Sequence, residues 1–213
     1  MLKLYYSENS SAYAPHMLLL DVEAKFQAIR VDLKNKAQLS ADFLSINPKG
    51  RVPVLVTPEG ILTETPALLL YISQINPERN FAPTDPFTLA QAQALNMYIA
   101  STVHVGHAHK HRGERWTDDP TAQTSMTAKV KRNMFSYAKF IEDNHLTGPW
   151  ALGGQYSMCD PYLSLVSRWL RNDGLNLNHF PKLTAHENLM GQRPSHQTCL
   201  LYTSDAADEH NCV

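Results

Sequence analysis

Cysteine is scarce in this sequence, and the three cysteines lie far apart. Cys159, Cys199 and Cys212 show no regular spacing in a chain of 213 residues. An odd number of widely spaced thiols argues against a disulfide framework and is typical of a protein in a reducing compartment. We therefore expect a cytoplasmic protein whose stability depends on a hydrophobic core.

The chain also lacks an excess of charge of either sign. Nineteen Lys and Arg residues oppose twenty Asp and Glu residues, which gives a net charge of −1. A nucleic-acid-binding protein usually has a basic excess, so this balance argues against a nucleic-acid partner. It also argues against a disordered polyelectrolyte, because 43% of the residues are hydrophobic and can form a core.

Long hydrophobic runs are missing as well. No apolar stretch approaches the roughly 20 residues needed to cross a bilayer. The first residues, MLKLYYSENSS, contain no apolar segment of the kind found in signal peptides. From these absences we expect no membrane partner.

The N-terminal third combines strand and helix patterns. Residues 2–6 and 28–33 alternate apolar and polar side chains, as strands do, and an apolar helix pattern at 15–25 separates them. Strand, helix and strand in this order indicate a βαβ unit with two parallel strands.

A hairpin and a helix follow this unit. Residues 52–56 and 61–63 are joined by a Pro-Glu-Gly turn signal and predict a β-hairpin. The next segment, 65–75, predicts a helix with Thr65 as its N-cap and Pro66 in its first position. No strand pattern is visible after residue 64.

The second half of the chain shows only helical stripes. We predict a domain at residues 1–79, a Pro-rich linker at 80–88, and an all-helical domain at 89–197. Apolar side chains then recur every three or four residues, as on one face of a helix. The stripes are Leu95, Ile99 and Val103; Val130, Met134, Tyr137 and Ile141; and Leu163, Val166 and Leu170.

The last residues, 198–213, shift in composition to small and acidic side chains. We interpret this stretch as an atypical tail, and our hypothesis is that it is translated vector sequence joined to a truncated reading frame. An intact genomic sequence that contains the tail would contradict the hypothesis.

Four short patterns occur in one order along the chain. They are NPKGRVP at 47–53, Glu64-Thr65 before an apolar helix, Ser157-x-x-Asp160 at the start of another, and FPKL at 180–183 followed by RPS at 193–195. In this order they resemble the glutathione transferase family over residues 1 to about 197. The resemblance implies an α/β thioredoxin-like N-terminal domain and an all-α C-terminal helical bundle.

The first loop is similar to that of bacterial beta-type members of the family. Their loop usually has a pattern like Asn-Thr-Cys-Ala-Leu-Ala-Pro-His, whereas residues 9–16 read NSSAYAPH, so the cysteine position falls on Ser11. A hydroxyl there would donate to the glutathione sulfur and favour the thiolate. Ser10 is a competing candidate, and either serine could simply cap a helix. His104 matches a family histidine near the thiol and could donate to the sulfur or relay a proton.

The resemblance also implies where glutathione binds. Val52 and Pro53, with Arg51 before them, would form a segment whose cis peptide turns the Val52 backbone toward glutathione, which then pairs as an added strand. Glu64 and Thr65, at a helix start, would hold the γ-glutamyl end of glutathione. The alternatives are an ordinary trans proline and plain helix capping.

Further predictions concern the remaining polar and aromatic side chains. Lys36 would take the glycyl carboxylate by its family position, or is a solvated loop lysine. We expect no metal, although a helix could place His104, His107 and His111 on one face. Ser157 and Asp160 form a capping device with no chemical role, beside a buried Cys159. The electrophile pocket is expected to include Tyr13, Met97, His107 and Trp116.

The function these residues predict is a bacterial glutathione transferase that conjugates the glutathione thiolate to small hydrophobic electrophiles in detoxification. Glutathione would be a co-substrate, with no permanent cofactor. The family resemblance implies a homodimer. One alternative is a non-catalytic binding or regulatory module, and another is a glutathione-dependent thiol-disulfide oxidoreductase. With serine at position 11, no mixed disulfide can form there, so disulfide reduction would be weak.

Overall fold

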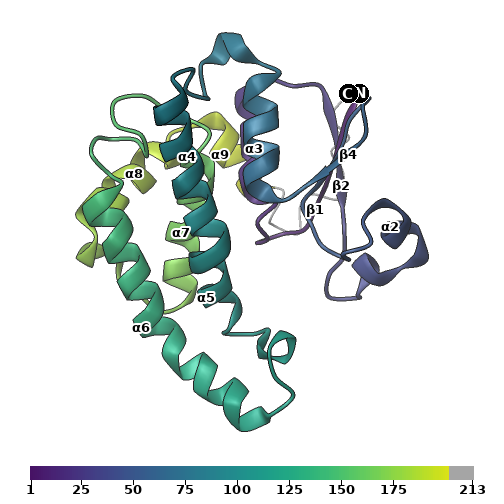
Figure 1. Cartoon of the computed structure of the whole chain (residues 1–213), viewed down its shortest axis with the longest axis vertical. Helices are drawn as coiled ribbons and strands as arrows, with labels where there is room; N and C mark the ends of the chain where they lie inside the picture. Colours follow the sequence, from purple (N-terminus) through teal and green to yellow (C-terminus); the bar gives the residue numbers. More distant parts are fainter. Residues whose placement is uncertain (202–213) are drawn as a thin grey trace. The chain divides into compact units, whose positions relative to one another are not determined.

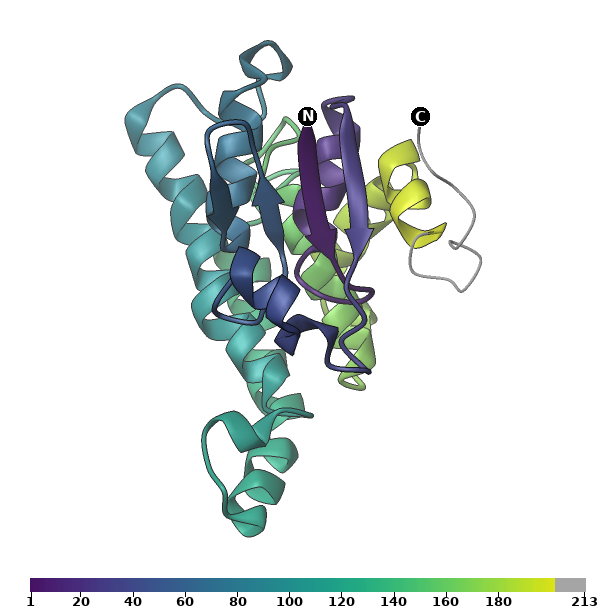
Figure 2. The ribbon, with the colours of Figure 1, turned by 90° about the vertical axis from the view of Figure 1, so that its right-hand side faces the viewer.

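The alternating N-terminal residues form the strand expected of them. In the computed structural model, which describes residues 1–201, β1 (Leu2–Tyr6) pairs in parallel with β2 (Phe26–Arg30). β3 (Val54–Val56) pairs antiparallel with both β1 and β4 (Ile61–Thr63). The sheet order is β2-β1-β3-β4 (Figure 2). This order confirms the predicted βαβ unit and hairpin, with β2 starting two residues earlier than expected.

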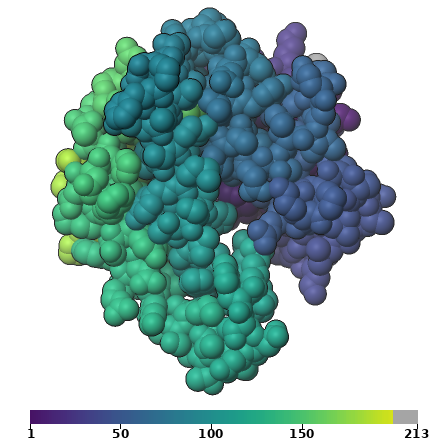
Figure 3. Space-filling view, viewed as in Figure 1, coloured from purple at the N-terminus to yellow at the C-terminus, as the bar shows by residue number. Residues whose placement is uncertain are grey.

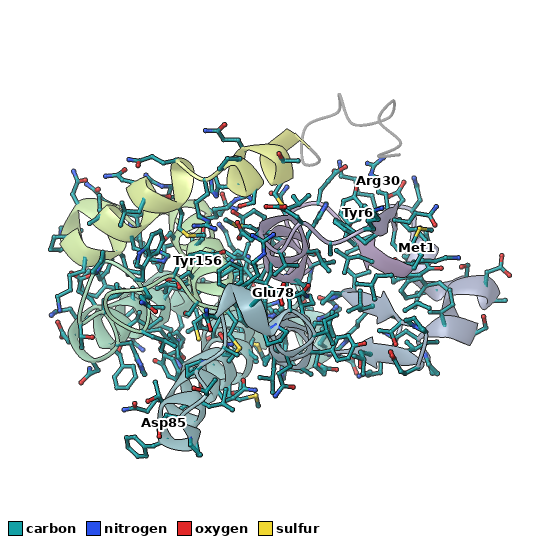
Figure 4. All side chains as sticks on the ribbon, turned by 90° about the horizontal axis from the view of Figure 1, so that it is seen from above. Met1, Tyr6, Arg30, Glu78, Asp85 and Tyr156 are labelled. Atoms are coloured by element: carbon teal, nitrogen blue, oxygen red, sulfur yellow. The ribbon has the colours of Figure 1, made fainter. Side chains whose placement is uncertain are left out.

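Helices cover both faces of this sheet. α1 (Tyr13–Asp21) and α3 (Thr65–Gln74) lie on one face, and α2 (Ala41–Ile46) lies on the other (Figure 1). Because side chains alternate along β1, Leu4 and Tyr6 are buried on the first face, while the Tyr5 ring meets Phe43 of α2 edge-on at 5.9 Å. The parallel strands end side by side at Tyr6 and Arg30 (Figure 4).

The rest of the chain is helical, and its predicted stripes form the core. α4 is Pro86–Tyr98, followed by a π-helical turn at Ile99–Val103, α5 at His104–Ala108, α6 at Pro120–Asn144, α7 at Asp160–Asn172, α8 at Pro181–Gly191 and α9 at Pro194–Leu201. The apolar residues of the stripes are at most 3% exposed, apart from Tyr137, which is partly exposed. Short 3-10 helices lie at Ala37–Leu39, Pro77–Arg79, Gly113–Arg115 and Leu177–His179.

The chain divides into two units, of which the second is Pro83–Met190. The first unit contains residues 1–82 and also the segment that begins at Gly191. Our predicted helical domain extended to residue 197, whereas the structure assigns α9 to the first unit. The physical reason lies at Asp21 of α1, whose carboxylate accepts hydrogen bonds from Arg193 Nη2 and Ser195 Oγ, each at 2.7 Å.

The helix that was expected to present three histidines on one face is shorter than predicted. α5 ends at Ala108, so His111 lies in the turn beyond it and does not share a helical face with His104 and His107. The stretch between α5 and the start of α6 stands out as a lobe of the second unit (Figure 3). The described residues contain no cluster of three His, Cys, Asp or Glu side chains suited to a metal ion.

Ser157 and Asp160 bond each other at the start of α7, as predicted, although Cys159 is the N-cap residue and makes no side-chain cap hydrogen bond. Asp160 is fully buried, and its Oδ2 accepts hydrogen bonds from the Ser157 backbone N–H at 2.7 Å and the Ser157 hydroxyl at 2.9 Å. Its Oδ1 accepts from the Ala151 N–H at 2.8 Å and bonds His186 Nε2 at 2.9 Å. Cys159 is fully buried, as predicted. This arrangement ties α7 to the loop before it and to α8.

Two further predictions concern the C-terminal tail and membrane-spanning helices. Of the predicted tail, residues 198–201 continue α9 and Cys199 is buried, while the hypothesis about residues 202–213 lies outside the described residues. No helix within residues 1–201 combines the length and the apolar character that crossing a membrane requires.

Candidate functional site

The loop between β1 and α1 distinguishes the two candidate serines. The Ser10 hydroxyl donates to the Ser7 carbonyl at 2.6 Å and accepts from the Ala12 N–H at 3.2 Å. Ser11 is 6% exposed, and its hydroxyl makes no hydrogen bond to any residue that the structure describes. Ser10 therefore stabilises the turn, whereas the Ser11 hydroxyl is available to a ligand.

The start of α3 lies against this loop. The Thr65 hydroxyl donates to the Ser11 carbonyl at 3.5 Å, a contact between residues 54 positions apart. The predicted N-cap is wrong: the helix begins at Thr65, and Glu64 is the capping residue. Glu64 has a φ of 72°, so the chain enters α3 through the left-handed region. This entry leaves the Thr65 side chain inside the helix and buried, where it reaches Ser11.

The α3 start keeps open backbone donors. Within residues 1–201, the N–H groups of Thr65 and Ala67 have no hydrogen-bond partner, and Pro66 between them has no N–H. The first N–H groups of a helix have no intrahelical acceptor and carry the positive end of its dipole. An anion at this position would therefore be stabilised by both.

Lys49 is a neighbour of this site that the sequence analysis did not single out. Its Nζ lies 2.5 Å from Glu64 Oε1 and 2.7 Å from Thr63 Oγ1. The Lys49 and Glu64 side chains are 50% and 70% exposed, and exposed ion pairs contribute little to stability. Lys49 lies within the NPKGRVP segment, but only the tertiary structure shows that it reaches across to Glu64.

The NPKGRVP segment forms a turn around the buried Asn47. Asn47 Nδ2 donates to the Arg51 carbonyl at 2.7 Å, and its Oδ1 accepts from the Lys49 N–H at 3.2 Å. The Val52–Pro53 peptide is cis, which confirms that prediction. The Val52 N–H and C=O make no backbone hydrogen bond to any described residue. The Arg51 side chain is exposed.

Lys36 and Tyr13 are predicted site residues that occupy different environments. Lys36 is exposed, with a φ of 57° at the start of a 3-10 helix. Tyr13 is 5% exposed, and its hydroxyl lies 2.6 Å from His196 Nδ1 on α9. The phenol of Tyr13 therefore already has a polar partner within the first unit, and its role toward an electrophile stays a prediction.

The other predicted site residues belong to the second unit. The His104 and His107 rings both stack on Trp169 of α7, with centroid distances of 4.7 and 5.0 Å. Met97 is 53% exposed, and Trp116 is 44% exposed with its ring edge-on to His109 at 4.4 Å. The structure thus places His104 and His107 on one indole and leaves Met97 and Trp116 at the surface.

Residues 1–74 match the model of the glutathione S-transferase N-terminal domain. A solved structure of a glutathione transferase homologue from Sulfitobacter, with bound glutathione, is 41% identical, has a TM-score of 0.90, and aligns over 93% of this chain and 96% of that one. The chain belongs to the glutathione S-transferase family.

Two other relatives of this glutathione S-transferase are bacterial. Glutathione S-transferase GstA of Escherichia coli O157:H7 is 28% identical over 203 residues, which is 93% of this chain and 97% of that protein. The bacterial beta class glutathione S-transferase of Sphingomonas chungbukensis is 28% identical with a TM-score of 0.78, covering 95% of this chain and 98% of that one. They agree with the predicted resemblance to beta-type members.

His16 is a buried titratable group of the transferase near the first loop. Burial lowers the pKa of His16, on α1, from 6.5 to about 4. The side chain is 3% exposed and its ring contacts those of Tyr6 and Phe26. His16 is therefore neutral at physiological pH and serves packing in α1.

Proposed function

We propose that this glutathione S-transferase conjugates the glutathione thiolate to small hydrophobic electrophiles. The observation that supports it most is the contact between Thr65 and the Ser11 carbonyl. That contact brings together the Ser11 hydroxyl and the open N–H groups at the start of α3, which have no partner among the described residues. A peptide thiol with a terminal carboxylate matches both features.

Glutathione would bind along three elements of the first unit. Its backbone would pair with the N–H and C=O of Val52 as an added strand, because the described structure leaves both groups without a backbone partner. Its γ-glutamyl carboxylate would accept from the Thr65 hydroxyl and from the open N–H groups of α3. Its ammonium would replace Lys49 at Glu64, and Lys36 would take the glycyl carboxylate.

The chemical step would need no covalent enzyme intermediate. The Ser11 hydroxyl would donate a hydrogen bond to the glutathione sulfur and so favour thiolate over thiol. The thiol proton leaves to water, the sulfur lone pair attacks an electrophilic carbon, and, with an aryl halide, halide departs. The protein would contribute positioning and electrostatic stabilisation. His104 would be a second donor to the sulfur, and Met97, His107 and Trp116, with Tyr13, would contact the electrophile.

The first experiment separates binding from catalysis. Retention on immobilised glutathione is measured, followed by turnover of 1-chloro-2,4-dinitrobenzene. We expect both. Binding without turnover would favour the alternative of a non-catalytic module, and absence of binding would contradict every function proposed for this site.

The serine assignment is tested by paired variants. We expect Ser11→Ala to lower kcat about 100-fold, comparable to removal of one stabilising donor. Ser10→Ala should mainly lower stability, by about 1 kcal/mol, because its hydroxyl only completes the turn. Unchanged turnover in Ser11→Ala together with loss in Ser10→Ala would show that the assignment is wrong. Ser11→Cys should increase thiol exchange with mixed disulfides of glutathione.

The oxidoreductase alternative has less support from the described thiols. Cys159 and Cys199 are buried, and burial raises the pKa of Cys159 well above its ordinary value. A buried thiol with a raised pKa is a poor nucleophile.

We further propose that the enzyme acts in detoxification as a cytoplasmic homodimer. Light scattering of the purified protein tests the oligomeric state.

A further inference from the structure

A buried carboxylate at the end of α7 has no role in the scheme above. Asp173 is the C-cap residue of α7, and its side chain has no exposed surface. A carboxylate at a helix C-terminus faces the negative end of the dipole, and burial adds a desolvation cost. No local rule of helix stability explains an acid here, so its partners must do so.

Asp173 contacts two side chains of the segment that follows the π-helical turn. Its Oδ2 lies 2.8 Å from His107 Nδ1, and its Oδ1 lies 3.4 Å from Lys110 Nζ. Lys110 also donates to the Asn172 carbonyl. His107 and Lys110, which can donate a proton or carry positive charge, therefore both face the Asp173 carboxylate.

This geometry decides the tautomer of neutral His107. An ionised carboxylate only accepts hydrogen bonds, so His107 Nδ1 must hold the proton and donate it. Nε2 then has a lone pair. The ring cannot turn freely, because it is stacked on Trp169 with an angle of 13° between the two planes. The His107 side chain remains 20% exposed, so it is not sealed off from solvent.

We propose that Asp173 is a positioning residue that makes His107 Nε2 a hydrogen-bond acceptor for the electrophile. The inference rests on the proposed function, in which His107 contacts that substrate. It adds a substrate class: small electrophiles that have an N–H or O–H group beside the reacting ring. A pocket that hydrogen-bonds such a group discriminates against analogues that lack it.

Asp173→Asn provides a selective test, because the structure determines how the amide will turn. The Lys110 ammonium lies 3.4 Å from Oδ1 without a hydrogen bond to it, and its charge favours the amide oxygen over the NH₂ on that side. The amide NH₂ then faces His107 Nδ1, which must accept. His107 consequently moves its proton to Nε2 and becomes a donor toward the electrophile, with almost no change in shape.

The experiment compares two substrates in wild type and variant. 4-Chloro-3-nitrobenzamide has N–H groups, and its N,N-dimethyl analogue has none. We expect the wild-type kcat/KM to favour the primary amide about tenfold, which corresponds to about 1.4 kcal/mol. Asp173→Asn should abolish this preference, with the KM for glutathione changed less than twofold. Nitrogen-15 NMR should show His107 protonated on Nδ1 in wild type and on Nε2 in the variant.

Two controls accompany the variant. Glu187→Gln removes the partly exposed α8 carboxylate that pairs with Arg171 of α7, and should leave both the preference and the His107 signals unchanged. His107→Phe keeps a ring on Trp169 without a hydrogen-bonding nitrogen. It should abolish the preference for the primary amide, whatever it does to the two rates, and Asp173→Asn should then have no further effect on that preference.

Several outcomes would overturn the inference. One is a wild-type enzyme that uses both amides equally, or uses neither while it turns over 1-chloro-2,4-dinitrobenzene. Another is neutral His107 protonated on Nε2 in the wild-type NMR spectrum, a measurement that does not depend on how the variant folds. If the wild type binds no glutathione, the proposed function fails, while the NMR result still decides the tautomer.

Discussion

The starts of α3 and α7 contain similar residues and do different things. Each has an acidic residue followed closely by a proline at the helix start: Glu64 and Pro66 in α3, Asp160 and Pro161 in α7. The Asp160 carboxylate is fully buried and bonds four groups of the protein. The Glu64 carboxylate is largely exposed and, within residues 1–201, pairs with Lys49 alone, while the N–H groups of Thr65 and Ala67 have no partner there.

The difference teaches how to separate a structural cap from a binding site. A buried charge is stable only when the protein satisfies its hydrogen bonds, so Asp160 has no capacity left for a ligand. A helix start whose donors remain open at the surface is hydrated in the free protein and can exchange water for an anion. Saturation by the protein indicates stability, and open donors indicate binding.

The largest expected effect comes from disrupting the start of α7, where the Asp160 carboxylate has four hydrogen-bond partners. In Asp160→Asn, either orientation of the amide turns its NH₂ toward two donors: the Ser157 pair, or Ala151 and His186. We expect a loss of about 3 kcal/mol or more, because donors are left buried without acceptors. All three tryptophans belong to the second unit, so urea unfolding followed by tryptophan fluorescence reports on it directly. A loss below 1 kcal/mol would contradict the saturated-cap interpretation.

A comparison of two buried histidines gives the next effect. His186 bonds the Asp160 carboxylate, whereas at His16 burial lowers the pKa to about 4. Between pH 6.5 and 4 the unfolded chain binds more protons at His16 than the folded one. Stability is therefore complete above pH 6.5 and falls by about 3 kcal/mol as the pH approaches 4. Hydrogen exchange of the α1 amides measures this loss of stability. His16→Gln should flatten the dependence of stability on pH. An equally steep dependence in His16→Gln would show that His16 is not its origin.

The start of α3, whose N–H groups are open to a ligand, is tested by removing the Thr65 hydroxyl. Thr65→Val keeps the branched shape and loses the hydroxyl proton, which is donated to the Ser11 carbonyl in the free protein and would be donated to the γ-glutamyl carboxylate in the complex. We expect glutathione affinity to fall about tenfold, or about 1.4 kcal/mol, by calorimetric titration. Thr65→Ser, the matched control, should remain within twofold of wild type. Equal affinity in Thr65→Val and wild type would remove Thr65 from the glutathione site.

The smallest effect is expected at the exposed pair. Lys49→Met removes the internal cation from Glu64, and stability should change by less than about 0.5 kcal/mol. Glutathione affinity should rise about twofold, because its ammonium no longer displaces a competitor. Glu64→Gln should lower the affinity several-fold with equally little change in unfolding. A large fall in affinity in Lys49→Met would show instead that Lys49 binds glutathione directly.

Much of this architecture could be predicted from local patterns. Alternation in residues 2–6 and the Pro-Glu-Gly turn signal predict strands, because side chains on a strand alternate between two environments. The stripes of the second unit predict its buried faces for the same kind of reason. The N-cap of α3 was wrong by one residue, because a left-handed residue such as Glu64 leaves no periodic signal.

The sequence by itself determined the four-stranded unit, the helical unit, the capping role of Asp160 and the family resemblance, since each depends on residues close together in the chain. Only the tertiary structure decided that Thr65 reaches the Ser11 carbonyl, that Lys49 meets Glu64, and that Asp173 meets His107. Those contacts join residues 15 or more positions apart. Their formation depends on how whole elements pack, and no local pattern of polar side chains specifies that packing.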